Sequence, residues 1–87
     1  MSRTAIGELL RFLGVDDPEL LRLLRSEGLF EDDELESVEA EELRVAVAWM
    51  RDLGVNPAGV DVALQLRRRL LVLESRLRDA LAQLEKR

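Results

Sequence analysis

The feature that most constrains the fold is an apolar repeat in the last third of the chain. Apolar residues recur at alternating steps of three and four positions, at Ala63, Leu66, Leu70, Leu73, Leu77, Ala80 and Leu84. This is the heptad spacing of a coiled coil, and three heptads extend over roughly 33 Å of helix. Asn56 is a good N-cap for this helix and Pro57 a good first residue.

A helix of this length would extend beyond a core built from the short segments that precede it. Its outer leucines then need a partner, and for a chain of 87 residues the simplest partner is a second copy. We therefore expect a homodimer whose interface is formed by Leu66, Leu70, Leu73, Leu77 and Leu84. Leucine fills both core positions of the heptad, so the repeat does not distinguish parallel from antiparallel helices.

Two short helices are predicted at the start of the chain. Thr4 can cap a first helix that runs roughly from residue 5 to residue 13, with its apolar residues on one stripe. Asp17 and Pro18 are a strong start signal for a second helix, which Gly28 ends. Two short helices joined by the turn "GVDD" are typical of a helix-turn-helix unit.

Residues 30–37 have no consistent period, and we interpret them as a loop, at most a vestigial hairpin. A third helix is predicted to begin between Ser37 and Ala40 and to end at Gly54, and Trp49 on this helix is interpreted as a core residue. The prediction is therefore a single all-α domain, 1–87. It comprises a helix-turn-helix head of three short helices (1–54) and a long dimerisation helix (55–87).

The composition argues against catalysis. The chain has no cysteine, so thiolate metal sites are impossible, and no histidine, so it lacks the commonest general base and the commonest metal ligand. The serines have no residue to activate them, and we expect a non-enzyme without a cofactor. The acidic residues of the loop do not follow the spacing of a calcium-binding loop, so we favour a solvated loop over a metal site. No apolar run could cross a membrane, and we expect a cytoplasmic protein.

The net charge of −5 is unevenly distributed. Residues 1–44 carry 13 acidic and 5 basic side chains, whereas residues 45–87 carry 5 acidic and 8 basic ones. A DNA-binding head usually has the opposite balance, so nucleic acid is an improbable partner. The basic run at residues 67–69 is interpreted as a solvated flank of the long helix.

Several segments resemble known families. "TAIGELLRFLGV", "LLRLLRSEGLF" and "VEAEELRVAVAWMRDLGV" resemble the MerR-like winged helix-turn-helix head. The entry into the last helix looks like that of the CbpM-type chaperone modulators, a pattern occupied here by Pro57, Gly59, Val60, Ala63, Leu64 and Leu66. This resemblance implies binding to the J-domain of a DnaJ-type co-chaperone and modulation of its cooperation with DnaK. A related role is that of a small DnaK–DnaJ assembly factor.

The chain departs from the DNA-binding MerR proteins in two respects. Arg22 matches an arginine that two tyrosines follow in those proteins, but Leu23 and Leu24 stand in the tyrosine positions. The segment corresponding to the basic wing is acidic here. A MerR-like DNA-binding regulator is the alternative hypothesis, and a structural dimer module is a third. The candidate partner-binding residues are Glu31, Asp32, Asp33, Glu34, Glu36 and Arg22.

Overall fold

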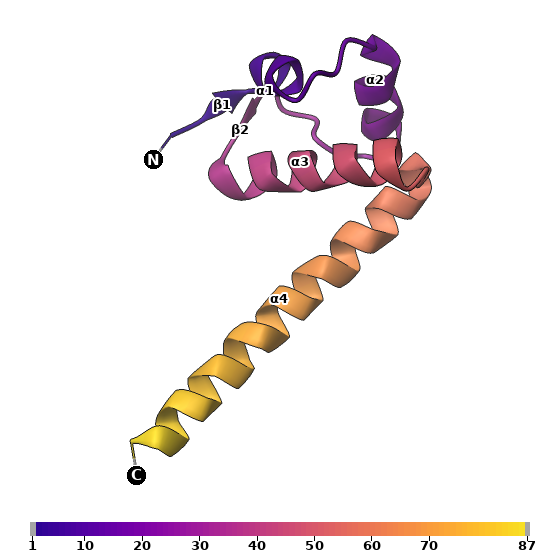
Figure 1. Ribbon diagram of the computed structural model, residues 1–87. Helices are drawn as coiled ribbons and strands as arrows, with labels where there is room; N and C mark the ends of the chain where they lie inside the picture. The colour runs from indigo at the N-terminus through magenta and orange to yellow at the C-terminus, as the bar shows by residue number, and fades with distance from the viewer. Residues whose placement is uncertain (1, 87) are drawn as a thin grey trace.

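The computed structural model describes residues 2–86, which form four helices and a small antiparallel sheet (Figure 1). In chain order the elements are β1 (Thr4–Ala5), α1 (Ile6–Phe12), α2 (Pro18–Ser26), β2 (Glu34–Leu35), α3 (Ser37–Asp52) and α4 (Pro57–Glu85). The terminal residues of the predicted domain, Met1 and Arg87, lie outside the described range. The predicted class, a mainly helical chain that ends in a long helix, is confirmed.

The starts of α2 and α4 were correctly predicted. The Asp17 side chain accepts a hydrogen bond from the Glu19 backbone N–H at 2.9 Å, and the Asn56 side chain accepts one from the Gly59 N–H at 2.7 Å. Each cap is followed by a proline at the first helical position, which has no N–H to leave unpaired. A Cβ at position 59 would lie 2.9 Å from Val55 Cγ1, so the tight entry into α4 requires glycine.

The predicted start of the first helix is wrong. Thr4 does not cap α1 but lies in β1, where it pairs with Leu35, and α1 begins at Ile6. The Ile6 N–H donates to the Asp33 carbonyl at 2.8 Å, so backbone pairing with the loop replaces the expected side-chain cap. The acidic segment therefore does not form a hairpin with itself. Its one short strand pairs with the start of the chain.

The core lies where α1, α2 and α3 meet the first turns of α4. Its buried residues are Ile6, Leu10, Leu24, Leu29, Phe30, Leu35, Leu43, Ala46, Val47, Val60 and Leu64. Trp49 packs against this cluster, as expected, whereas Leu53 at the end of α3 is exposed. The solvated-loop interpretation missed that Phe30 and Leu35 anchor the loop in the core.

Helix α4 gives the molecule its elongated shape. The principal extents are 54 × 29 × 21 Å, and the radius of gyration is 15.7 Å. A compact chain of this length would have a radius of gyration of about 12 Å. Figure 1 shows α4 leaving the C-terminal end of α3 and diverging from the rest of the molecule. Every residue from Arg68 to Lys86 is exposed, so only the first turns of the helix belong to the core.

Candidate interaction surfaces

Helix α4 has one face in the core and another in solvent. Val60 and Leu64 are completely buried against the head, which we define as residues 2–54. The predicted interface residues form what we call the leucine stripe: Leu66, Leu70, Leu73, Leu77 and Leu84. These side chains are each between 56 and 61% exposed, and Leu81 beside them is half exposed. None of these leucines belongs to the core or packs against it. The stripe is therefore an apolar surface without a partner among the described residues.

A buried ion pair ties α4 to α3. Glu42 is 4% exposed, and its two carboxylate oxygens accept hydrogen bonds from Arg68 Nε at 2.6 Å and Arg68 Nη2 at 2.9 Å. These bonds raise the pKa of Arg68. One sequence-based expectation is corrected here. The basic run at residues 67–69 is not simply a solvated flank, because Arg68 is one partner of this pair. The Glu42 carboxylate is buried and not accessible to another protein.

The arginines of α2 are occupied within the head. Arg22 makes two hydrogen bonds to Glu19 one turn earlier, with Nε 2.8 Å from Oε2. Hydrogen bonding from Arg22 lowers the pKa of Glu19, and the carboxylate in turn raises the pKa of Arg22. Arg22 was grouped with the loop acids as a candidate contact residue, but its bonds are to its own helix and not to the loop.

Arg25 is the α2 residue that contacts the loop. Its Nε donates to the Phe30 carbonyl at 2.9 Å, and its Nη2 lies 3.2 Å from Asp33 Oδ1. Phe30 has a φ of 54°, a left-handed conformation that costs energy in any residue other than glycine. The bond from Arg25 and the burial of the Phe30 ring hold this conformation. Apart from the presence of an arginine on α2, nothing in the sequence signals this contact between Arg25 and the loop.

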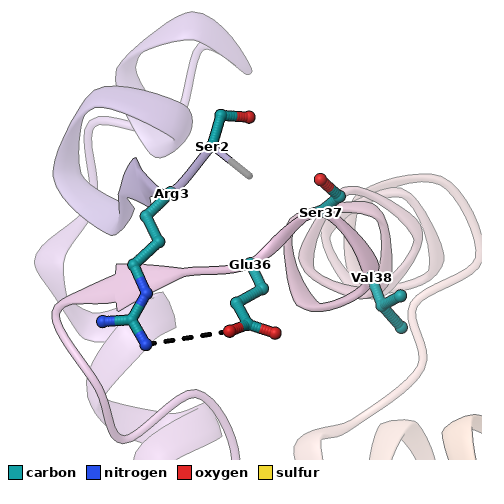
Figure 2. Close-up of a pocket in the computed structure, with 5 residues that line it drawn as sticks. All are labelled: Ser2, Arg3, Glu36, Ser37 and Val38. Carbon is teal, nitrogen blue, oxygen red and sulfur yellow. Dashed lines mark ion pairs between the residues drawn. The ribbon is translucent and has the colours of Figure 1, made fainter.

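The five candidate acids all belong to the acidic loop (residues 30–36), but they differ in their partners. Asp33 is paired with Arg25, and Glu36 lies 3.7 Å from Arg3 (Figure 2). Glu31, Asp32 and Glu34 are exposed and have no ion pair among the described residues. Asp32 and Glu34 line a hollow beside Arg3, whereas Glu31 lines another hollow near Glu27 and Arg68, so the three unpaired carboxylates of the loop do not share one hollow.

A shallow pocket lies next to the loop, between the start of the chain and the start of α3. It is lined by Ser2, Arg3, Glu36, Ser37 and Val38, and Val38 is largely exposed (Figure 2). The Arg3–Glu36 pair closes one side, and the Ser2 and Ser37 hydroxyls lie along the other. The Glu36 carboxylate in this pocket is paired with Arg3, and the exposed Val38 adds an apolar surface beside it.

Within residues 2–86, no group of acidic side chains is arranged to hold a metal ion, and no helix has the length and apolar character needed to cross a membrane. In the comparisons with known proteins, no family model, no curated protein and no solved structure matches this chain.

Proposed function

We propose that this chain is a non-catalytic adaptor that binds the J-domain of a DnaJ-type co-chaperone and regulates its cooperation with DnaK. The observation that supports the proposal most directly is the distribution of charge on the head. Both arginines of α2 donate hydrogen bonds to acceptors inside the head. The carboxylates of Glu31, Asp32 and Glu34 are exposed and have no ion-pair partner among the described residues. The head thus presents carboxylates, and its natural partner is a cationic protein surface.

The family resemblance of the α4 entry suggests which cationic surface this is. J-domains present a basic helix, as that resemblance implies, and three exposed carboxylates would attract it. Charges at the rim of an interface mainly raise the association rate and make it salt-dependent. We expect the exposed acids to steer the encounter, and apolar contacts such as Val38 beside the loop to add affinity.

The alternative, a MerR-like DNA-binding regulator, has less support. Such a protein needs free cations on α2 and on the wing to neutralise phosphates. In this head Arg22 and Arg25 are already bonded within the structure, and the loop in the position of the wing is acidic. This arrangement favours the adaptor.

The proposed adaptor acts as a homodimer through the leucine stripe. Five leucines on one helix face, each more than half exposed, form a larger apolar surface than monomeric proteins usually leave in water. Burying a leucine contributes about 1.5–3 kcal/mol, so two stripes together can offset an association cost of about 4–15 kcal/mol. Sedimentation at micromolar concentration should give about twice the protomer mass of 9.9 kDa. A monomer at that concentration would contradict the dimer.

Calorimetric titration with the isolated J-domain of a DnaJ-type protein from the same organism tests the adaptor role. We expect binding in the micromolar range or tighter, with an association rate that falls as salt is added. No heat and no competition at tens of micromolar would rule the proposal out.

A charge-neutralising triple variant tests the site itself. Glu31→Gln, Asp32→Asn and Glu34→Gln should together slow association and flatten its dependence on salt. A matched control removes the same number of charges elsewhere, through Asp52→Asn, Asp79→Asn and Glu85→Gln. If the control slows association as much as the loop variant, the effect comes from net charge and the loop is not the site.

A further inference from the structure

The two apolar faces of α4 point in nearly opposite directions. A helix turns by about 100° per residue, so the row formed by Val60, Leu64 and Arg68 lies roughly 140° around the helix from the leucine stripe. The buried row is occupied by the head. A second copy of α4 can therefore lie along the stripe without displacing the head, and each head would then sit on the outer side of the helix pair.

The two edges of the leucine stripe carry different charges. In the heptad frame, one edge carries Arg69 and Arg76. The other edge carries Arg67 and Glu74. Arg69, Glu74 and Arg76 are exposed, and none of them has an ion-pair partner among the described residues. Their charges are therefore free to act on a neighbouring helix.

The direction of the second helix decides which edges meet. In a parallel pair, unlike edges face one another, and Arg69 lies beside Glu74 of the partner subunit on both sides of the dimer. In an antiparallel pair, like edges face one another. With position 80 opposite position 63, one side pairs Arg67 with the partner's Glu74, but the other places Arg69 against the partner's Arg76. With position 80 opposite position 70, Glu74 faces the partner's Glu74 and Arg76 faces the partner's Arg76. The parallel arrangement keeps its attractive contacts without this repulsion.

We infer that the two copies of α4 associate in parallel, with the two heads at the same end of the coiled coil. The inference rests on the proposed homodimer and adds its direction. The acidic heads lie on the outer faces of the helix pair, so two helices of about 10 Å diameter separate them. That distance exceeds the Debye length of about 8 Å at physiological salt, and repulsion between the heads is largely screened. A parallel dimer would present both acidic loops at one end of the molecule.

Cysteine cross-linking tests the direction cleanly, because the chain has no cysteine of its own. Ala80 is exposed and occupies a core position of the heptad. In a parallel dimer two Ala80→Cys chains bring their cysteines together and form a disulfide in a glutathione buffer. In an antiparallel dimer, position 80 faces position 63 or 70. The two cysteines would then be roughly 15–25 Å apart, too far for the Cα separation of about 4–7 Å that a disulfide needs.

A mixture of two single-cysteine variants tests for the antiparallel arrangement. When Ala80→Cys chains are mixed with Ala63→Cys chains, parallel helices should give disulfides only between identical variants. A predominant disulfide between position 63 of one chain and position 80 of the other would overturn the inference. If the unmodified protein sediments as a monomer, the homodimer itself fails. A dimer that does not cross-link through Ala80→Cys removes only the parallel direction.

Charge reversal at one edge separates the parallel pair from both antiparallel registers. Arg69→Glu places a carboxylate beside the partner's Glu74 in a parallel dimer, and should weaken dimerisation about tenfold. In an antiparallel dimer with position 80 opposite position 63, the same change converts a repulsion with the partner's Arg76 into an attraction and should strengthen dimerisation. With position 80 opposite position 70, Arg69 lies beside the partner's Gln83, and the change should have little effect. Adding Glu74→Arg restores the opposite charges and should recover the parallel dimer. Tighter association of Arg69→Glu would refute the parallel pair.

Discussion

Replacing Arg68 by methionine isolates the contribution of the ion pair that joins α4 to the head. Methionine keeps an apolar stem of similar length but removes both hydrogen bonds to Glu42, which are 2.6 and 2.9 Å long. The Glu42 carboxylate is 6% exposed and would be left without a partner. The variant should therefore lose stability mainly through the desolvated carboxylate.

The expected loss in the free energy of unfolding depends on how far the Glu42 and Arg68 side chains are each buried. Removing one partner of a fully buried ion pair costs about 3–5 kcal/mol. The Arg68 side chain is 52% exposed, so water can reach the vacated position and solvate part of the carboxylate. We therefore expect a loss of about 2 kcal/mol in the free energy of unfolding, below the cost for a fully buried pair. For a domain of this size that loss lowers Tm by about 10 °C.

Urea denaturation followed by circular dichroism at 222 nm measures this change. Because the proposed dimerisation would also stabilise the folded chain, variants must be compared at the same protomer concentration. Arg78→Met is the matched control: Arg78 is on the same helix, exposed and without an ion pair among the described residues. It should change stability by less than about 0.5 kcal/mol. Glu42→Leu combined with Arg68→Met should recover most of the loss, since no buried charge remains. An Arg68→Met protein as stable as the control would refute the reasoning.

Four further outcomes can be measured directly. Leu70→Asp should give a monomer in sedimentation where the unchanged chain gives the proposed dimer, because burying an unpaired carboxylate costs several kcal/mol. Gly59→Ala should lower the free energy of unfolding by about 1 kcal/mol although alanine favours helices, since its Cβ would meet Val55 at 2.9 Å. Arg22→Gln should return the lowered pKa of Glu19 towards its ordinary value in an NMR titration. The Glu19–Arg22 pair contributes to the free energy of unfolding at pH values above the ordinary glutamate pKa. This contribution is lost as the pH falls through the lowered pKa of Glu19. Random duplex DNA should bind very weakly at about 0.15 M salt, and salt-sensitive micromolar binding would contradict this expectation.

Features set by a few neighbouring residues could be predicted from the sequence. The caps at Asp17 and Asn56 involve partners two or three residues away, and the prolines that follow them reinforce the same signal. The leucine stripe was visible because a helical repeat is a property of one segment alone. For the same reason the helix content and the long last helix were predictable.

Features that join distant segments were missed. β1 pairs with β2 only because the fold brings the chain start to the acidic loop, and nothing near Thr4 signals this. Glu42 and Arg68 are 26 positions apart. The sequence nevertheless indicated that both residues lie on core-facing sides of their helices. Glu42 shares the core face of α3 with Ala46, and Arg68 continues the row of Val60 and Leu64. The division of the loop acids into paired and unpaired ones depends on Arg25 and Arg3, so it could not be predicted from the loop alone.

The separation of the two faces of α4 also affects how the protein can change over evolution. Residues that stabilise the head lie on the row of Val60 and Leu64, and the exposed leucines contribute nothing to that core. Substitutions on well-separated, non-contacting surfaces have nearly additive effects. The outer face of α4 can therefore accumulate changes in length, charge or apolar pattern while the head keeps its fold. One helix thus offers selection two nearly independent targets, the stability of the head and the choice of what α4 associates with.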